Sequence, residues 1–389
     1  MLTTLAIANY RSLRNLIVPL QRLNLITGPN GSGKSSVYRA LRLLAETAQG
    51  GVITSLAREG GLQSTLWAGP EKIGRAVKRG EHKVEGTVRR ERTSLRLGFA
   101  GDEFGYAIDL GLPARDTKTS AFALDPEIKT ECIWAGPILR PASVLVERKT
   151  WVVRTRRSDG EWDVLSHDLS PFDSMMAQFA DPRNAPEMFM LREHVRSWRF
   201  YDHFRTDVAA PARLPQIGTH TPILSNDGMD MAAALQTIRE IGDAAALNKA
   251  VDDAFPRSRI DVLNVDGRFE IAVHQHGLLR PLKAAELSDG TLRYLLWIAA
   301  LLTPRPPSLL VLNEPETSLH PDLLPALGRL IANAAERSQV FVVTHAAKLI
   351  AVLEKQAQCN CVRLEKQFGE TRIVGMGALD APPWRWASR

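Results

Sequence analysis

The spacing of hydrophobic and polar residues in the first half of the chain is mainly that of strands. Residues 1–27 form short apolar runs, broken near Asn15 and Pro19, which predict short strands. A glycine-rich turn follows, and residues 34–48 then have the apolar spacing of a helix. From about residue 83 to 165, strand-like segments alternate with Gly, Asp and Pro residues. This alternation predicts an antiparallel sheet.

The pattern changes near Pro171, and helical spacing becomes more frequent beyond it. Segments 186–205 and 229–256 are predicted to be helical, with the proline-rich stretch 209–222 as a loop between them. Beyond about residue 285 the order becomes helix, strand, helix, strand, which is typical of a parallel sheet. Together these patterns predict an α/β fold with a mixed or parallel core sheet, an antiparallel β lobe and a helical lobe.

The composition is that of a globular protein and adds three exclusions. The chain has 389 residues, of which 44% are hydrophobic and 24% charged. Its 3 cysteines are too few for a disulfide framework, which favours a reducing compartment. No apolar run approaches the roughly 18 residues that span a bilayer, and the N-terminus lacks a signal-peptide pattern. We therefore expect a cytoplasmic protein with no membrane partner.

A glycine-rich loop at residues 28–35 carries the clearest chemical signal. It reads Gly-Pro-Asn-Gly-Ser-Gly-Lys-Ser and matches the phosphate-binding pattern G-x-x-x-x-G-K-[ST]. The glycines let backbone N–H groups surround an anion, and the helix that follows adds the positive end of its dipole. Lys34 is expected to contact the β- and γ-phosphates and Ser35 to bind Mg²⁺. The residues expected to contact a nucleotide are Asn30, Gly31, Ser32, Gly33, Lys34, Ser35 and Ser36.

Two later strands are predicted to end in polar residues. The apolar run 309–312 leads directly into Asn313 and Glu314, and the run 339–344 leads into His345. In open α/β folds this end of a strand lies at the ligand-binding edge. Glu314 is placed to polarise an attacking water, and His345 to contact the γ-phosphate or support that water. The alternatives are a surface acid that begins a turn and a histidine that caps the next helix.

A third polar segment, at residues 286–290, precedes an amphipathic helix. It reads Glu-Leu-Ser-Asp-Gly, in which Ser288 has the position of an N-cap. Such a helix start is also an anion site, because free amides and a hydroxyl point at the same place. The predicted buried strand that leads into Glu314 begins about 20 residues later, and this order favours an anion site over a simple helix cap.

These segments resemble the motifs of ABC-type ATPases. Residues 28–36 look like the Walker A motif of that class, and residues 287–290 look like its signature motif. Residues 310–316 look like the Walker B motif, and residues 344–345 look like the switch-histidine motif. Residues 9–13 and 314–321 resemble motifs of the RecF, SMC and OLD-like branch. The resemblance implies a P-loop NTPase fold of the ABC-ATPase head type, without a coiled coil or nuclease domain. It spans nearly the whole chain.

The resemblance also implies a nucleotide site shared between two subunits. The head would bind ATP with Mg²⁺ and form a homodimer around two nucleotides. Ser288 and Gly290 of one subunit would meet the γ-phosphate held by Lys34 of the other. Arg11 joins the nucleotide-binding residues by the same resemblance. The catalytic residues implied are Glu314, His345 and Lys34.

The Mg²⁺ ligands implied by the resemblance are Ser35, Asn313 and a glutamine. Gln178 is the preferred glutamine and Gln63 the alternative. The family usually has Asp where this chain has Asn313. An amide keeps the hydrogen-bonding shape but loses a negative charge near Mg²⁺, which weakens metal retention. We therefore expect slow hydrolysis that still depends on Glu314.

The motif positions divide the chain into three lobes of one split ATPase domain. Residues 1–170 carry Walker A and the antiparallel sheet, and residues 171–303 form a helical lobe that ends in the signature motif. Residues 304–389 hold Walker B, the D-loop, which the last residues of segment 314–321 resemble, and the switch histidine. Too few residues follow His345 for a nuclease domain, so any nuclease is expected on a separate chain.

The basic charge is concentrated in two segments. Residues 71–96 contain nine Lys or Arg against four Glu, and residues 140–157 contain six against one, while the whole chain is +6. The preferred hypothesis is an ATPase head that acts on or near DNA through these segments, in repair or phage defence by family analogy. Solvated strand faces are the alternative for the charge. The second hypothesis for function is a nucleotide-gated interaction protein that controls a separate effector chain without binding DNA.

Overall fold

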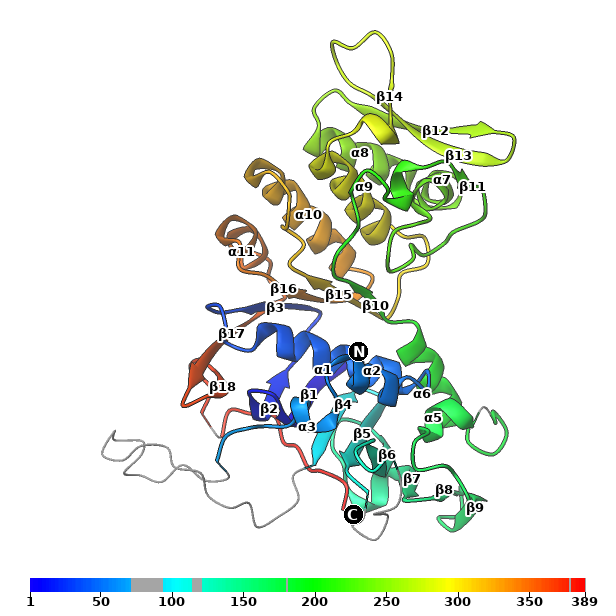
Figure 1. The fold of residues 1–389 in the computed structure, drawn as a ribbon, viewed down its shortest axis with the longest axis vertical. Helices are drawn as coiled ribbons and strands as arrows, with labels where there is room; N and C mark the ends of the chain where they lie inside the picture. The colour runs from blue at the N-terminus through cyan, green and yellow to red at the C-terminus, as the bar shows by residue number, and fades with distance from the viewer. Residues whose placement is uncertain (71–93, 114–120, 180, 378, 389) are drawn as a thin grey trace. The chain divides into compact units, whose positions relative to one another are not determined.

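The protein is described by a computed structural model that covers residues 1–70, 94–113, 121–179, 181–377 and 379–388. The chain forms two compact units (Figure 1). Unit 1 comprises residues 1–21, 27–197 and 362–389, and unit 2 comprises residues 22–26 and 198–361. These boundaries differ from those of the three predicted lobes. The lobes were defined by the positions of the motifs, and they stay a prediction.

Unit 1 contains an eight-stranded sheet in which each strand pairs antiparallel with its neighbours, as the pattern between residues 83 and 165 predicts. The order is β2 (Leu13–Pro19), β1 (Leu2–Tyr10), β4 (Leu95–Gly101), β5 (Phe104–Gly111), β6 (Glu127–Ala135), β7 (Val144–Lys149), β8 (Val152–Arg156) and β9 (Trp162–Ser166). The predicted break near Asn15 is wrong, because Asn15 pairs with Ala8 inside β2. The chain turns instead at Arg11, whose φ is 51°.

The first three helices of unit 1 lie between β2 and β4 in the sequence, and the last two follow β9. They are α1 (Lys34–Thr47), α2 (Val52–Arg58), α3 (Leu62–Thr65), α5 (Met175–Gln178) and α6 (Pro186–Arg196). The helix predicted for residues 34–48 is confirmed as α1, which buries an apolar face that includes Leu41 and Leu44. The helix predicted for 186–205 is too long. It ends at Arg196, because the next residues form a strand of unit 2.

Unit 2 is built on four parallel strands in the order β10 (Arg199–Tyr201), β15 (Leu309–Asn313), β16 (Gln339–Val343) and β3 (Leu23–Thr27). The parallel sheet predicted beyond residue 285 is confirmed. In its register Asn313 pairs with Val343, and Val343 pairs with Ile26. The carboxyl ends of β15, β16 and β3 therefore lie at one edge.

Helices and a small antiparallel sheet complete unit 2. The helices are α7 (Met231–Ile241), α8 (Ala244–Ala254), α9 (Asp289–Leu301), α10 (Leu324–Ala335) and α11 (Ala347–Leu353). The small sheet contains β11 (Gln216–Ile217), β12 (Arg259–Val265), β13 (Arg268–His274) and β14 (Leu282–Lys283). The predicted helical segment 229–256 is interrupted at Gly242, because Asp243 begins a new helix by accepting a hydrogen bond from Ala246 N.

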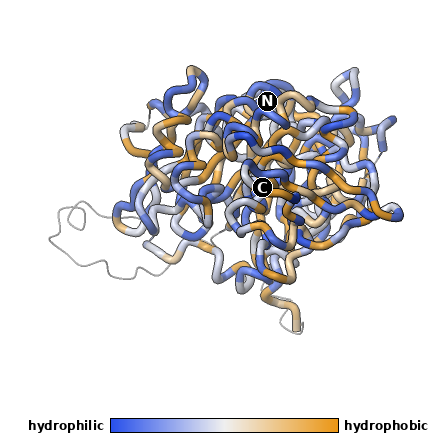
Figure 2. The backbone as a smooth tube through the Cα atoms, turned by 90° about the horizontal axis from the view of Figure 1, so that it is seen from above, coloured by the Kyte–Doolittle hydropathy of each residue, from blue (hydrophilic) through white to orange (hydrophobic). Residues whose placement is uncertain are grey.

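The helix α9 forms the centre of the apolar core of unit 2. Its buried side chains include Leu295 and Trp297, and they pack with apolar residues of α7, α10 and the parallel strands. Figure 2 shows that hydrophobic and hydrophilic residues alternate in short stretches along the described part of the chain. Among the described helices, none is long and apolar enough to cross a membrane.

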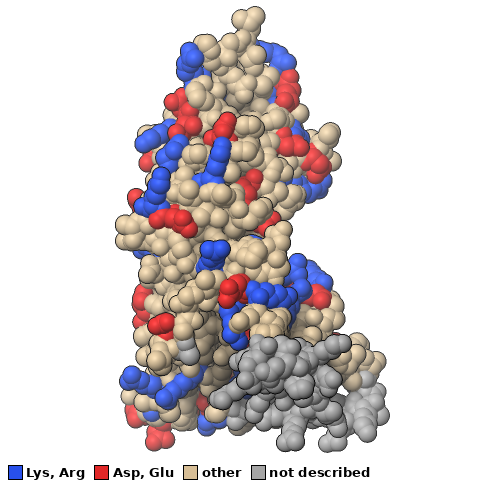
Figure 3. Space-filling view, turned by 90° about the vertical axis from the view of Figure 1, so that its left-hand side faces the viewer, with Lys and Arg blue, Asp and Glu red and all other residues tan. Residues whose placement is uncertain are grey.

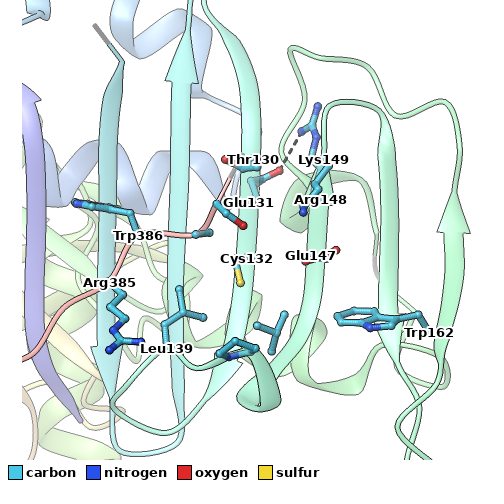
Figure 4. Close-up of a pocket in the computed structure, with 14 residues that line it drawn as sticks. Thr130, Glu131, Cys132, Leu139, Glu147, Arg148, Lys149, Trp162, Arg385 and Trp386 are labelled. Carbon is cyan, nitrogen blue, oxygen red and sulfur yellow. Dashed lines mark hydrogen bonds and ion pairs between the residues drawn. The ribbon is translucent and has the colours of Figure 1, made fainter. Parts of the chain in front are cut away.

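The hairpin of β17 (Cys359–Gln367) and β18 (Glu370–Ile373) follows unit 2 in the chain. Beyond it, the C-terminal residues pack on the sheet of unit 1. There the rings of Trp384 and Trp134 meet edge to face, with their centroids 5.6 Å apart. A pocket of about 410 Å³ lies where this C-terminal segment meets β6 and β7 (Figure 4). It is lined by side chains such as Cys132, Trp162 and Trp386.

A buried ion pair joins the strands at this pocket. Arg148 and Glu131 are both fully buried, and their side chains are 3.0 Å apart (Figure 4). The Glu131 carboxylate also accepts hydrogen bonds from Tyr106 and Ser174. The pKa of Tyr106 is raised, mainly because the hydroxyl is buried and also because the Glu131 carboxylate is close to it. Arg148 belongs to the predicted basic segment 140–157, but its charge is neutralised inside the unit.

Replacement of Arg148 by Met is expected to destabilise the fold strongly. The substitution leaves the Glu131 carboxylate buried without its counter-charge, which costs about 3–5 kcal/mol. Arg154→Met is the control, because Arg154 pairs with Glu147 at a partly exposed site and is worth at most about 1 kcal/mol. Urea denaturation of the two variants measures the difference. Equal losses would contradict a dominant role for the buried pair.

Candidate functional site

The predicted phosphate loop lies between β3 and α1, as the motif requires. Gly28, Gly31 and Gly33 have φ values of 145°, 78° and 106°, a region that residues with a Cβ rarely adopt. A Cβ on Gly33 would lie 2.3 Å from Thr371 Oγ1 of β18. The loop glycines are thus required both by the backbone conformation and by a close neighbour.

The loop presents groups that suit an anion. The Lys34 ammonium is nearly buried and donates to the carbonyl oxygens of Gly28 (2.7 Å) and Pro29 (3.2 Å) within the loop. Ser32 Oγ is buried and has no hydrogen-bond partner among the described residues. The helix α1 has no acidic residue in its first turn and no side-chain cap, so its terminal amides are available to an anion.

Thr371 supports the loop from β18 and was not found from the sequence. Its hydroxyl donates to Ser32 O over 2.8 Å and lies 2.8 Å from Ser12 Oγ. Its backbone N–H also donates to Ser12 O. No local pattern marks Thr371, because the contact joins residues that are far apart in the chain.

Arg11 makes its contacts elsewhere in unit 1. Its guanidinium donates to Glu59 Oε2 over 2.6 Å, and the Tyr10 hydroxyl donates to the same carboxylate. Burial and the Glu59 hydrogen bond raise the pKa of Tyr10. The predicted role of Arg11 in nucleotide binding stays a prediction.

Gln178 is not placed to share a metal site with Ser35, which corrects that prediction. Gln178 ends α5, and its neighbour Ala177 lies 3.5 Å from the Cβ position of Gly50, just beyond the C-terminus of α1. Ser35 lies at the other end of α1, which is roughly 20 Å away at 1.5 Å per residue. Gln63, the alternative, is an exposed residue of α3.

The structure of unit 2 brings Glu314 and His345 together. His345 Nδ1 lies 3.6 Å from Glu314 Oε1 and 3.3 Å from Glu316 Oε1. Glu314 has a φ of 47°, and its N–H donates to Val343 O of the neighbouring strand. Both side chains are partly exposed. His345 does not cap α11, whose N-cap is Ala346, so that alternative is not observed.

Glu316 fixes the segment that carries His345. Its side chain is only 7% exposed. Its Oε1 accepts hydrogen bonds from Thr344 Oγ1, His345 N and Ala346 N. The sequence shows Glu316 within the Walker B-like motif but does not indicate this positioning contact.

Asn313 has a polar neighbour that the sequence did not indicate. Its Nδ2 donates to Asp202 Oδ1 over 2.6 Å, and Asp202 directly follows β10. Within the described part of the chain, no group of three or more His, Cys, Asp or Glu is arranged to hold a metal ion. This does not exclude Mg²⁺, which in nucleotide sites is bound mainly by phosphates, waters and one or two protein groups.

Ser288 is the N-cap of α9, which is the simpler of the two interpretations of this segment, capping and anion binding. Its Oγ accepts a hydrogen bond from Thr291 N over 3.2 Å. The buried Arg213 fixes this turn by donating to Leu287 O (2.7 Å) and to Asp289 Oδ1 (2.6 Å). Ser288 itself is exposed. The geometry is compatible with anion binding but does not require it.

The comparisons with known proteins agree with this fold and these motifs. The model of a family described as "AAA domain, putative AbiEii toxin, Type IV TA system" matches residues 23–351. The chain therefore belongs to this AAA-domain family, and the predicted resemblance to ABC-type ATPase heads is confirmed. No curated protein sequence matches the chain.

Similar solved structures include heads of SMC proteins. In the crystal structure of the SmcHead bound to the C-winged helix domain of ScpA, the head is 12% identical with a TM-score of 0.52, and the match covers 98% of this chain and 99% of that chain. The SMC head domain from Thermotoga maritima is 14% identical with a TM-score of 0.46, covering 97% and 99%. The first likeness confirms the predicted P-loop ATPase head fold.

Substitution of Gly33 by Ala is expected to destabilise unit 1 more than the same change at Gly31. Both residues have a positive φ, so both variants carry a backbone cost of about 1–2 kcal/mol. A Cβ at Gly31 has no neighbour within 4 Å, whereas one at Gly33 meets Thr371. Thermal denaturation without nucleotide compares the variants. A loss for Gly31→Ala equal to that for Gly33→Ala would show that the Thr371 contact has no effect.

Proposed function

We propose that this chain is an ATPase head that binds ATP with Mg²⁺ and hydrolyses it slowly. The register of the parallel sheet carries the proposal. Ile26 of β3 is aligned through Val343 with Asn313 of β15, and the chain continues from Ile26 into the phosphate loop within two residues. By the resemblance to ABC-type ATPase heads, a nucleotide held by the loop is expected to meet the polar residues that follow β15 and β16.

The proposed roles follow from the chemistry of each group. Lys34 leaves its loop carbonyls to bind the β- and γ-phosphates, and Ser35 and Asn313 hold Mg²⁺. The ion, when bound, neutralises phosphate charge. Glu314 polarises the attacking water and His345 supports it, while Glu316 holds the segment of His345 in place. Ser32 Oγ, which has no partner among the described residues, is available to a phosphate.

The proposal includes an ATP-dependent homodimer. Ser288 is exposed at the start of α9, where amides and a hydroxyl are available to a γ-phosphate held by a second copy. Such a dimer would couple nucleotide state to a surface that a separate effector recognises. The family description names a type IV toxin–antitoxin system, and this role is proposed for the chain by family analogy alone. Phage defence and DNA repair are proposed on the same basis.

Replacement of Glu314 by Gln is expected to slow ATP hydrolysis at least about 100-fold while ATP binding persists, because only the general base is lost. The variant should also accumulate as a dimer with ATP, measured by sedimentation. Phosphate release measures the rate. Lys34→Ala is expected to abolish both ATP binding and dimer formation.

Two further variants control the dimer measurement. Ser288→Arg, made in the Glu314→Gln background, places a bulky side chain at the proposed contact and is expected to prevent the dimer. Ser158→Arg places the same side chain on an exposed turn of unit 1 and should leave it intact. Hydrolysis by Glu314→Gln at the wild-type rate would show that its catalytic assignment is wrong.

DNA binding is the second proposal, and the structure narrows the surface that would carry it. Segment 71–96 lies, except for residues 94–96, outside the described residues. In segment 140–157, Arg148 is buried with Glu131, Arg154 pairs with Glu147, and Arg157 pairs with Asp159. On the face drawn in Figure 3, described basic and acidic side chains are interspersed.

The hairpin between β7 and β8 is the specific observation that favours DNA. Lys149 is exposed, and Trp151 beside it is 54% exposed. An exposed cation next to an exposed indole is the combination that binds a single-stranded backbone and stacks on a base. Trp134, in contrast, is fully buried and serves the core.

Lys149→Gln is expected to lower the salt dependence of single-stranded DNA binding by about one phosphate contact. Trp151→Ala is expected to weaken the free energy of binding by about 1–3 kcal/mol, because a stacking contact with a base is lost. Lys355→Gln removes an exposed charge from unit 2 and should have no effect. Fluorescence anisotropy at several salt concentrations provides the measurement. Wild-type affinity in both hairpin variants would remove this hairpin from the DNA surface.

A further inference from the structure

Two strands of unit 2 end in one hydrogen-bonded polar pair. Tyr201 of β10 pairs with Leu312 of β15, so the next residues, Asp202 and Asn313, lie at the same edge of the sheet. Asn313 Nδ2 donates to Asp202 Oδ1 over 2.6 Å. The carboxylate can only accept in this contact, so the amide is oriented with its nitrogen toward Asp202.

The orientation leaves an unsatisfied oxygen. An amide has its oxygen opposite its nitrogen, so Asn313 Oδ1 points away from Asp202. This oxygen is buried and has no hydrogen-bond partner among the described residues. A buried acceptor without a donor is unfavourable, because it has lost its hydrogen bond to water without a replacement. A cation, or a water bound to one, would satisfy it.

The two other carboxylates at this edge, Glu314 and Glu316, lie beside His345. Glu316 is buried, and its Oε1 accepts three hydrogen bonds from residues 344–346, while its Oε2 has no partner among the described residues. Glu314 lies 3.6 Å from His345. Asp202 is exposed, and its carboxylate accepts the hydrogen bond from Asn313 Nδ2. It is the carboxylate in direct contact with the Asn313 side chain, and it therefore adds negative charge next to this amide.

We propose that Asp202 supplies the negative charge that Asn313 lacks, so that the pair retains Mg²⁺ at the end of β15. Carboxylate and amide oxygens are ligands that Mg²⁺ accepts, directly or through its waters. Asn313 provides an oxygen and a fixed position, and Asp202 provides the charge from the adjacent strand. The inference rests on the proposed nucleotide function.

The test measures how strongly Mg²⁺ promotes nucleotide binding, independently of hydrolysis. The affinity of the full chain for a fluorescent ATP analogue is determined in Mg²⁺ and in EDTA, and the ratio of the two is the metal coupling. Asp202→Asn is expected to lower this ratio about tenfold. Its affinity in EDTA should be unchanged or higher, because a charge that repels phosphate is removed. Structural damage would instead weaken binding in both conditions.

A double variant and a matched control sharpen the result. Asp202→Asn combined with Asn313→Asp moves the carboxylate onto β15 and is expected to restore the ratio to within about threefold. Asp266→Asn removes a carboxylate from an exposed turn with a φ of 51°, which Asn tolerates, and should have no effect.

Three outcomes in the variants would overturn the inference. They are a wild-type ratio in Asp202→Asn, equal losses in Mg²⁺ and EDTA, and a double variant that recovers nothing. A wild-type chain that binds the analogue equally with and without Mg²⁺ would also overturn it. A wild-type chain that binds no nucleotide would defeat the proposed function itself, and the two failures are thereby distinguished.

Discussion

The parallel pairing of β10, β15, β16 and β3 is the constraint on which the chemistry of unit 2 depends. Each of these strands has buried apolar residues, and those of β15 and β16 are buried on both faces of the sheet, which keeps the strands inside the core. The register aligns Ile26, Val343 and Asn313 at one edge. The polar residues that follow are therefore placed by the core, and not by their own hydrogen bonds alone.

Buried charged groups then hold the loops at this edge in position. Arg213 ties the turn before α9 to Asp289, and Arg293 of α9 donates to Thr317 O and Phe204 O. Glu316 performs the same task for the segment after β16. A buried charge that loses its partners is costly, so each contact gives the loops one preferred arrangement. The sites that need precise geometry are thus supported by residues with no proposed part in the chemistry.

Several predictions from local pattern were right because the determining interactions are local. The loop at residues 28–35 and the helix α1 follow from glycine conformation and apolar spacing. Other predictions were wrong because the deciding interaction is distant in sequence. The helix expected over 186–205 ends at Arg196, since the aromatic run after it pairs with β15. Gln178 was expected near Ser35, but α5 packs at the opposite end of α1.

The sequence by itself determined the phosphate loop, the order of strands and helices in the last hundred residues, and the residues that end β15 and β16. These follow from periodicity and from motifs whose residues are neighbours in the chain. Only the tertiary structure decided that Asp202 accompanies Asn313, that Thr371 supports the loop, and that Arg148 is buried. The physical reason is the same in each case. Strand pairing and burial join residues far apart in the chain, and no local pattern records those contacts.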